Sequence, residues 1–186
     1  LFSQSVYGTR QTPPFTEDRS AMAETVYAQA KYATELMLDS VKFINKQTFG
    51  TSLRLSALSG GQKGLVLTDI LAKIVTQALN EESIEILDGS QKLERLDVRD
   101  AADAIAALLR TDFNHWFPVY NLGNGNACTI LEMATKVKEI AEKYYNKKTS
   151  INIYSTKKIP LSKEMNTSSF ENLTGWKATY SLEDQI

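Results

Sequence analysis

The sequence predicts an α/β fold, because short runs rich in apolar residues alternate with amphipathic stretches of helical periodicity along the whole chain. A second observation is composition: of the 186 residues, 42% are hydrophobic and 23% are charged, which suits one globular domain with a core. Strands that alternate with helices favour an α/β sheet built with crossover connections. Neither an internal repeat nor a low-complexity linker is visible in the sequence.

The first part of the chain predicts two strands and two helices. The opening LFS indicates the end of a strand, and a polar loop over 9–20, broken by Pro13 and Pro14, leads into a predicted helix over 21–47. Its apolar residues recur at spacings of three and four, which predicts one buried face: Val26, Ala30, Ala33, Met37 and Val41. A strand over 51–58, a loop over 60–64 and a second amphipathic helix over 65–80 follow.

The second part of the chain continues the alternation. The expected extended segments are 84–87, 93–98, 118–123 and 151–155. An alanine-rich helix is expected to start at Asp100, whose carboxylate suits the positive helix end. A further helix is expected to open at Thr129, with Glu132 three residues on in the pattern of a capping box. The tail, 168–186, predicts a short helix, a glycine turn and a final turn of helix.

Charge and cysteine content argue against several classes of protein. The formal net charge of −1 and the pI of 6.0 leave no global basic field for nucleic acid or an anionic membrane. Cys128 and His115 are the single cysteine and the single histidine, so an internal disulfide and a Cys/His zinc cluster are excluded. No apolar run approaches the roughly 18 to 20 residues that cross a bilayer, and the first residues lack the basic start of a signal peptide. We therefore expect a cytoplasmic protein without metal, nucleic acid or membrane.

A tyrosine and a lysine four residues apart, on one face of a helix, form the candidate chemical motif. This spacing occurs three times in the sequence, and the first pair is Tyr27 with Lys31. The other two are Tyr144 with Lys148 and Tyr154 with Lys158, which lie in lysine-rich polar stretches typical of a solvated surface. Tyr27 and Lys31 differ because SQSVYG precedes them at a strand end and Glu35 continues their helical register.

Six segments in a fixed order carry a resemblance to a known family: Ser3-Gln-Ser-Val-Tyr-Gly8, Tyr27-xxx-Lys31-xxx-Glu35, LRLSALSGG, DVRDAADAI, PVYNLGNG and LTGWKATYSLEDQI. Together they make the chain similar to the later part of an extended short-chain dehydrogenase/reductase of the nucleotide-sugar epimerase and dehydratase group. The resemblance implies the C-terminal part of an NAD(P)-binding Rossmann fold with a small α/β substrate-binding subdomain. Residues 1–60 would belong to the Rossmann domain and 61–186 mainly to the subdomain, with a return segment near 93–123 in the core sheet.

The family also places a glycine-rich phosphate loop and an acidic residue for the adenosine ribose before this point. Neither is in the sequence, and Gly123-Asn-Gly125 matches a late segment near the sugar nucleotide instead. The chain is therefore interpreted as roughly the last three fifths of an enzyme, which is expected to be inactive alone. The choice between NAD and NADP lies in residues before Leu1.

The resemblance implies a catalytic set of Ser3, Tyr27 and Lys31. Tyr27 would be the acid/base, Ser3 would hydrogen-bond the reacting hydroxyl, and Lys31 would favour the ionised tyrosine and hold the nicotinamide ribose. Hydride transfer from a sugar carbon to NAD (or NADP) would give a keto sugar, and return to the other face would invert the centre. The expected residues for the nucleotide-sugar substrate are Ser3, Ser5, Arg54, Lys92, Arg95, Tyr120 and Asn121.

Several of these assignments have a structural alternative. Arg54 is equally interpreted as a strand residue paired with a carboxylate, and Tyr120 with Asn121 as an ordinary strand end. Lys92 and Arg95 point to opposite faces of a β segment, so at most one would reach a phosphate. His115 and Cys128 lie outside the family's matching places and are interpreted as structural.

The reaction type depends on the residues beside Ser3. Gln4 and Ser5 stand where dehydratases of the family carry acidic residues, and neither is a general acid or base at neutral pH, so epimerisation or reduction is favoured. Ala57 and Leu93 stand where many members carry an asparagine and an arginine for the substrate. This leaves three hypotheses: an epimerase, an NADP-dependent keto-sugar or carbonyl reductase, and a non-catalytic relative. A homodimer through the helix bearing Tyr27 and the helix over 65–80 is implied by the resemblance.

Overall fold

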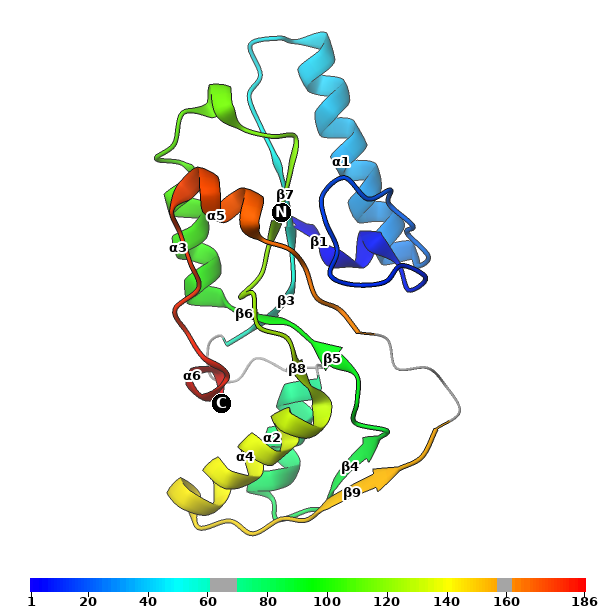
Figure 1. The fold of residues 1–186 in the computed structure, drawn as a ribbon, viewed down its shortest axis with the longest axis vertical. Coiled ribbons are helices and arrows are strands. Elements are labelled where there is room, and N and C mark those ends of the chain that lie inside the picture. The colour runs from blue at the N-terminus through cyan, green and yellow to red at the C-terminus, as the bar shows by residue number, and fades with distance from the viewer. Residues whose placement is uncertain (61–69, 157–161) are drawn as a thin grey trace. The chain divides into compact units, whose positions relative to one another are not determined.

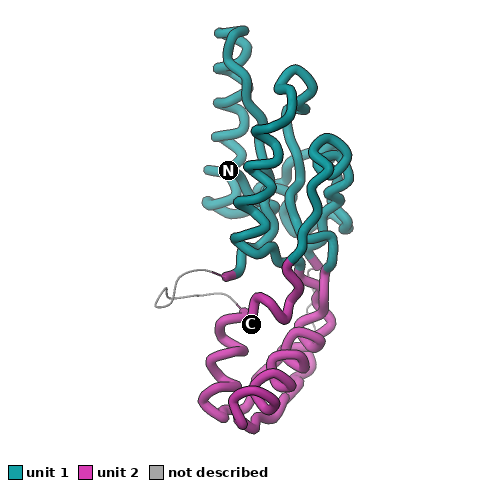
Figure 2. The backbone as a smooth tube through the Cα atoms, turned by 90° about the vertical axis from the view of Figure 1, so that its left-hand side faces the viewer, with its two compact units in different colours: residues 1–59, 94–126, 163–179 teal, residues 60–93, 127–162, 180–186 magenta. Residues whose placement is uncertain are grey.

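A three-stranded parallel sheet forms the centre of the first of two compact units; Figure 1 shows its strands and Figure 2 the two units. The computed structural model describes residues 1–60, 70–156 and 162–186. Unit 1 comprises residues 1–59, 94–126 and 163–179, and unit 2 comprises residues 60–93, 127–162 and 180–186. Each unit is described by itself.

The sheet of unit 1 has the order β1-β2-β7, with β1 at Phe2–Ser3, β2 at Ser52–Leu55 and β7 at Val119–Leu122. All pairs are parallel, and the register sets Ser3 opposite Leu55 and Leu55 opposite Leu122. A second parallel pair joins β3 (Ala57–Ser59) to β6 (Arg95–Asp97). Parallel strands need crossover connections, and the helices between these strands supply them.

The helices of unit 1 lie on both sides of this sheet, with α1 on one side and α3 and α5 on the other (Figure 1). Their bounds are α1 at Val26–Ile44, α3 at Val98–Leu108 and α5 at Ser168–Thr174, with 3-10 turns η1 at Gln4–Tyr7 and η2 at Phe113–His115. The core between sheet, α3 and α5 is apolar and includes Leu53, Leu96, Tyr120, Leu122 and Phe170.

Unit 2 packs two helices against short strands. Helix α2 spans Ile70–Leu79 and α4 spans Ile130–Tyr145, and α6 is a single turn at Leu182–Gln185. β4 (Ile84–Leu87) pairs in parallel with β9 (Ile151–Tyr154), and β5 (Lys92–Leu93) pairs antiparallel with β8 (Cys128–Thr129). The capping box predicted at Thr129 is present, since Thr129 Oγ1 accepts from Glu132 N at 3.0 Å and Glu132 accepts from Thr129 N at 2.7 Å.

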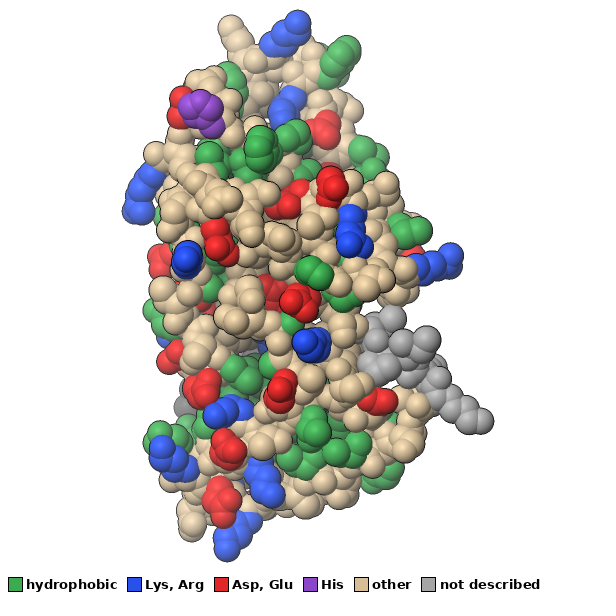
Figure 3. Space-filling view, viewed as in Figure 1, with side chains coloured by type: hydrophobic (Ala, Val, Ile, Leu, Met, Phe, Trp, Pro, Cys, Tyr) green, Lys and Arg blue, Asp and Glu red, His purple; other side chains and the backbone are tan. Residues whose placement is uncertain are grey.

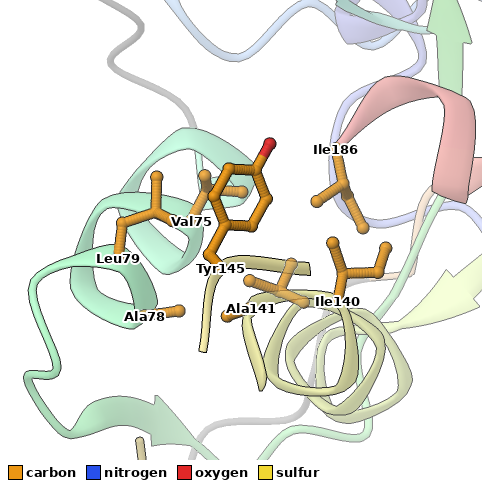
Figure 4. Close-up of a pocket in the computed structure, with 8 residues that line it drawn as sticks. Val75, Ala78, Leu79, Ile140, Ala141, Tyr145 and Ile186 are labelled. Carbon is orange, nitrogen blue, oxygen red and sulfur yellow. The ribbon is translucent and has the colours of Figure 1, made fainter. Parts of the chain in front are cut away.

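A small cavity lies among the apolar side chains of α2 and α4. It measures about 30 Å³, and Figure 4 shows the Tyr145 ring between side chains of α2 and Ile186. Roughly 10 to 15 Å³ of such cavity volume is enough for one water molecule. The cavity is therefore a packing gap, too small for a sugar or a nicotinamide.

The described part of α1 corrects the prediction of its buried face. Val26, Met37 and Val41 are 84%, 66% and 48% exposed, whereas Ala28 and Glu35 are buried. Ala30 and Ala33 are exposed as well. The helix packs through the Glu35 side because Glu35 forms an ion pair with Arg54 of β2, a contact that apolar periodicity does not reveal.

Two predicted strands are each interrupted. The segment 51–58 becomes β2 and β3, because Ser56 N donates to Leu122 O and the next residues pair with β6 instead of β7. The segment 93–98 becomes β5 and β6, separated at Glu94, whose carboxylate accepts hydrogen bonds from backbone N–H groups. In both cases the interruption coincides with hydrogen bonds to residues distant in the sequence.

The predicted start of α3 at Asp100 is also wrong. The helix begins at Val98, and Asp97 is its cap, with Oδ1 accepting from Arg99 N at 2.8 Å. Asp100 is buried and accepts from Thr179 N and Oγ1, both at 3.0 Å. The predicted loop beyond Gly60 and residues 65–69 of the predicted second helix lie outside the described residues, as does Lys158.

Candidate active site

A cleft of about 360 Å³ opens at the carboxyl ends of β1 and β2, within unit 1. Its polar lining consists of Ser3, Gln4, Ser5, Tyr27, Ser56 and Lys163. Ligands of open parallel sheets bind beyond the carboxyl ends of the strands, so the cleft has the expected location for a site. It also combines two predicted catalytic residues, Ser3 and Tyr27.

Ser3 is held by the turn that follows β1. It is the N-cap of η1, and its Oγ accepts from Ser5 N at 3.2 Å and donates to Ser5 Oγ at 3.2 Å. The turn ends at Gly8, where φ is +73° and an added Cβ would lie 2.3 Å from Met22 O. Glycine is required there, because other residues would meet both backbone strain and this clash.

Tyr27 and Lys31 lie in the first turns of α1. Thr25 caps the helix, with Oγ1 accepting from Ala28 N at 3.1 Å. Tyr27 is 57% exposed and lines the cleft, and Lys31 Nζ lies 5.7 Å from the centroid of the Tyr27 ring. The lysine is thus within cation–π distance of the tyrosine on one helical face, as the spacing predicts.

A buried polar cluster joins the elements that carry Ser3 and Tyr27. Arg54 Nη2 donates to Glu35 Oε2 at 2.7 Å, and Arg54 Nε donates to Glu35 Oε1 at 3.1 Å. The guanidinium also lies 4.8 Å from the Tyr7 ring centroid, and Tyr7 Oη donates to Asn121 Oδ1 at 2.7 Å. Burial raises the pKa of Tyr7, while Arg54 and Asn121 offset this in part.

Arg54, Tyr120 and Asn121 do not line the cleft. Arg54 has the paired arrangement that was the alternative to a substrate contact. Tyr120 is fully buried, and its hydroxyl accepts from Phe117 N at 2.8 Å. Asn121 donates from Nδ2 to Phe15 O at 3.0 Å, so its amide holds a loop against β7.

The two candidate phosphate cations lie in different units. Lys92 is an exposed residue of β5 in unit 2. Arg95 is buried in β6 of unit 1, and its Nη2 lies 3.4 Å from Leu58 O. Ser5, by contrast, lines the cleft beside Ser3.

Three polar residues of the cleft were not among the predicted site residues: Gln4, Ser56 and Lys163. The first two follow strand ends directly, and this position beyond parallel strands was the signal that could have identified them.

Lys163 has no sequence signal, because its position depends on hydrogen bonds to residues distant in the sequence. Glu94 N donates to Lys163 O at 3.1 Å, and Met165 N donates to Glu94 Oε2 at 2.9 Å. Burial raises the pKa of Glu94, and the backbone donors oppose this rise.

Other features of the described residues do not form a comparable site. A wider surface hollow of about 560 Å³ in unit 2 is lined by charged, aromatic and apolar residues, and Lys136 in it pairs with Glu183 at 3.0 Å. Within the described ranges, His, Cys, Asp and Glu form no group of three that could hold a metal ion. Acidic and basic side chains are interspersed over the face in Figure 3. Each helix in the described part is too short or too polar to cross a membrane.

Comparisons with known proteins point to one family. A family model described as the NAD dependent epimerase/dehydratase family matches residues 1–123. A search of the curated proteins found no match. The matched range contains the cleft residues Ser3, Gln4, Ser5, Tyr27 and Ser56.

Solved structures show the same fold. RMD from Pseudomonas aeruginosa, complexed with NADPH, matches with a TM-score of 0.81 and 21% identity over 99% of this chain and 62% of that chain. UDP-glucose 4-epimerase from Thermotoga maritima, with UDP-glucose, matches with a TM-score of 0.80 and 22% identity over 99% of this chain and 58% of that chain. For dTDP-glucose 4,6-dehydratase from Bacillus anthracis, in complex with NAD, the TM-score is 0.79 and the identity 20%, over 99% of this chain and 57% of that chain. The chain spans between 57% and 62% of the length of these proteins, and the likeness confirms the predicted Rossmann-type α/β fold.

Proposed function

Because the chain belongs to the NAD-dependent epimerase/dehydratase family, we propose that it is the catalytic part of an enzyme that epimerises a nucleotide sugar through a keto-sugar intermediate. The observation that carries the proposal is the common cleft of Ser3 and Tyr27, with Lys31 beside the tyrosine. The resemblance gives these three residues their roles. We also propose a cytoplasmic location, because the single cysteine excludes an internal disulfide within the chain.

The proton chemistry is assigned to Tyr27. Tyr27 lines the cleft, and its hydroxyl takes the proton of the sugar hydroxyl as the carbon is oxidised. Ser3 Oγ orients that hydroxyl, and the Lys31 ammonium stabilises the negative charge that develops on the tyrosine oxygen. After the keto sugar turns its other face, Tyr27 returns the proton.

The donors beside the cleft fit a nicotinamide ribose. No described carboxylate forms an ion pair with Lys31, so its ammonium has donors for ribose hydroxyls. When bound, NAD (or NADP) accepts hydride from the sugar carbon and gives it back. Tyr27 and Lys31 are therefore the residues of this chain that we assign to the cofactor.

Epimerisation is preferred over dehydration because the cleft lacks an acidic side chain among its described lining residues. Gln4 and Ser5 lie next to Ser3, and neither exchanges a proton with substrate at neutral pH. Elimination of water needs such an acid. Gln4 and Ser5 stand where dehydratases of the family carry acidic residues, so this site differs from that of a dehydratase in lacking the acid.

The test is Tyr27→Phe in the full-length protein, with Tyr144→Phe as the matched control. Tyr144 has the same spacing to a lysine but is an exposed residue of α4 in unit 2. We expect kcat to fall by about 10²-fold or more in Tyr27→Phe and to stay unchanged in Tyr144→Phe. Near-normal turnover of Tyr27→Phe would contradict the assignment.

The same assay separates the alternatives. An epimerase leaves the absorbance of reduced nicotinamide unchanged after full turnover, whereas a reductase consumes one reduced cofactor per substrate. Nucleotide-sugar binding without turnover would instead indicate a non-catalytic relative.

We also infer that the protein forms a homodimer through α1. The exposed side of this helix carries Val26, Leu36, Met37 and Val41, each at least 48% exposed. A contiguous apolar surface of this kind seldom remains in contact with water.

A further inference from the structure

Two residues that line the cleft each carry a buried side-chain oxygen that lacks a hydrogen-bond partner among the described residues. The oxygens are Gln4 Oε1 and Ser56 Oγ. The residues are 6% and 4% exposed, and both line the cleft with Ser3 and Tyr27. Buried polar atoms are nearly always hydrogen-bonded in native proteins, so two of them on residues of one cleft call for an explanation.

The sheet places these two residues side by side. The β1–β2 register sets Ser3 opposite Leu55. Gln4 follows Ser3 directly in the sequence, and Ser56 follows Leu55 directly. Neighbouring strands lie about 4.8 Å apart, so the two side chains start from adjacent points on the carboxyl edge. Their backbones are fixed, since Ser56 N donates to Leu122 O at 3.0 Å and Gln4 begins η1.

The chemistry of the pair selects a ligand with hydroxyl groups. An amide oxygen accepts a hydrogen bond, and a serine hydroxyl both accepts and donates. Neighbouring hydroxyls of a sugar ring supply both functions. Neither side chain titrates near neutral pH, so this recognition does not depend on protonation.

We propose that Gln4 and Ser56 bind two hydroxyl groups of the sugar ring held between Ser3 and Tyr27. This inference rests on the proposed function and assigns two specificity-determining residues to its substrate. In the ligand-free protein the two oxygens are desolvated without compensation, which disfavours the folded state. Bound sugar removes this penalty, so the pair favours ligands with hydroxyls at these positions over analogues that lack them.

The test uses Gln4→Met and Ser56→Ala in the full-length protein, because each removes the polar atom and keeps most of the side-chain volume. Gln47→Met and Ser40→Ala are the matched controls, since both positions are exposed and lie away from the cleft. UDP-glucose and NAD are titrated separately by calorimetry, and thermal unfolding is measured without ligand. We expect the Kd of UDP-glucose to rise about tenfold in each cleft variant, while the Kd of NAD stays within twofold.

The unfolding temperature gives a second readout. Removing an uncompensated buried polar atom should leave the Tm of ligand-free Gln4→Met and Ser56→Ala unchanged or higher. A lower Tm with unchanged UDP-glucose binding would overturn the inference, because the atoms would then serve the fold. A raised Kd of NAD with unchanged UDP-glucose binding would also overturn it, since the pair would then bind the nicotinamide amide.

Failure of the proposed function gives a different pattern. If Tyr27→Phe keeps full turnover while the cleft variants still weaken UDP-glucose binding, the catalytic assignment fails and the binding inference holds. If Tyr27→Phe is inactive and both cleft variants bind UDP-glucose like the wild type, the catalytic assignment holds and the binding inference fails. A wild-type protein that binds neither UDP-glucose nor UDP-glucuronic acid contradicts the binding inference together with the substrate part of the proposed function.

Discussion

Arg54 and Glu35 form a bidentate ion pair in the interior of unit 1, with their side chains 5% and 4% exposed. The pair joins β2 to α1, two helical turns after Tyr27. Arg54 also contacts the ring of Tyr7, which belongs to the same turn as Gln4. The elements that carry Ser3 and Tyr27 are therefore connected through one buried charge pair.

Loss of one partner of this pair should strongly destabilise the protein. Glu35→Gln leaves the Arg54 charge buried without its counter-ion, and we expect a loss of about 3 kcal/mol in the free energy of unfolding. Urea denaturation of the full-length protein measures this loss. Asp39→Asn, an exposed change on the same helix, is the control and should stay within about 0.5 kcal/mol of the wild type. Equal stabilities for Glu35→Gln and Asp39→Asn would contradict the structural role.

Asp97 should contribute stability that depends on pH. The hydrogen bond from Arg99 holds the pKa of this carboxyl below its usual value of 3.8. A depressed pKa in the folded state stabilises the protein above pH 3.8, and this contribution disappears as the pH falls through the folded-state pKa. Asp97→Asn keeps a cap oxygen but removes the charge that pairs with Arg99, so it should cost about 1 kcal/mol at pH 7, and the difference from wild type should shrink below pH 3.8.

Denaturation of Asp97→Asn at several pH values measures this dependence. Asp103→Asn, at an exposed position of α3, is the control. A difference between Asp97→Asn and wild type that grows as the pH falls would have the wrong sign for this explanation.

Gly123 should not tolerate even alanine. A Cβ at this position would lie 2.0 Å from Glu94 Oε1, and the displaced carboxylate would lose its bonds to Gly125 N and Met165 N. We expect Gly123→Ala to reduce the free energy of unfolding by about 3 kcal/mol or more. Gly175→Ala, where φ is +68° and no atom lies within 4 Å of the added Cβ, should cost about 1 to 2 kcal/mol from backbone strain alone. Similar losses for both variants would show that Glu94 accommodates the methyl group.

The proposed dimer predicts that a charge on α1 separates the subunits. Met37 is 66% exposed, so Met37→Glu should leave the fold intact and shift sedimentation equilibrium toward the monomer. Leu109→Glu, at a residue 69% exposed beyond α3, is the control and should leave association unchanged. A wild-type protein that is monomeric at every concentration tested would contradict the proposed interface.

Periodicity and capping chemistry predicted much of the fold. The strand over 84–87 and the capping box at Thr129 depend on local sequence, and the structure has both. The buried face of α1 was wrong because a long-range ion pair, not apolar spacing, selects the side that Glu35 occupies. Asp97 was missed as a helix cap because Asp100 is also an aspartate in front of the alanine-rich stretch, and an aspartate at either position predicts an N-cap.

Only those residues of the candidate site that belong to a recognisable sequence motif could be predicted. Ser3 and Tyr27, which their motifs single out, line one cleft, and their catalytic roles stay a prediction. The predictions of Tyr120 and Asn121 as substrate residues remain untested, and their side chains are buried in hydrogen bonds of the fold. Lys163 was missed because the hydrogen bonds that bring it to the cleft start at Glu94, 69 residues earlier in the chain.

The strand order β1-β2-β7 has a consequence for synthesis on the ribosome. Until residues 119–122 have emerged, β2 has a neighbour on one side and an open row of backbone donors and acceptors on the other. The cleft residues Ser3, Gln4 and Ser56 are translated long before that edge is closed. A nascent chain in which β7 has not yet formed therefore exposes the open side of β2, on which a strand of another unfinished chain can pair.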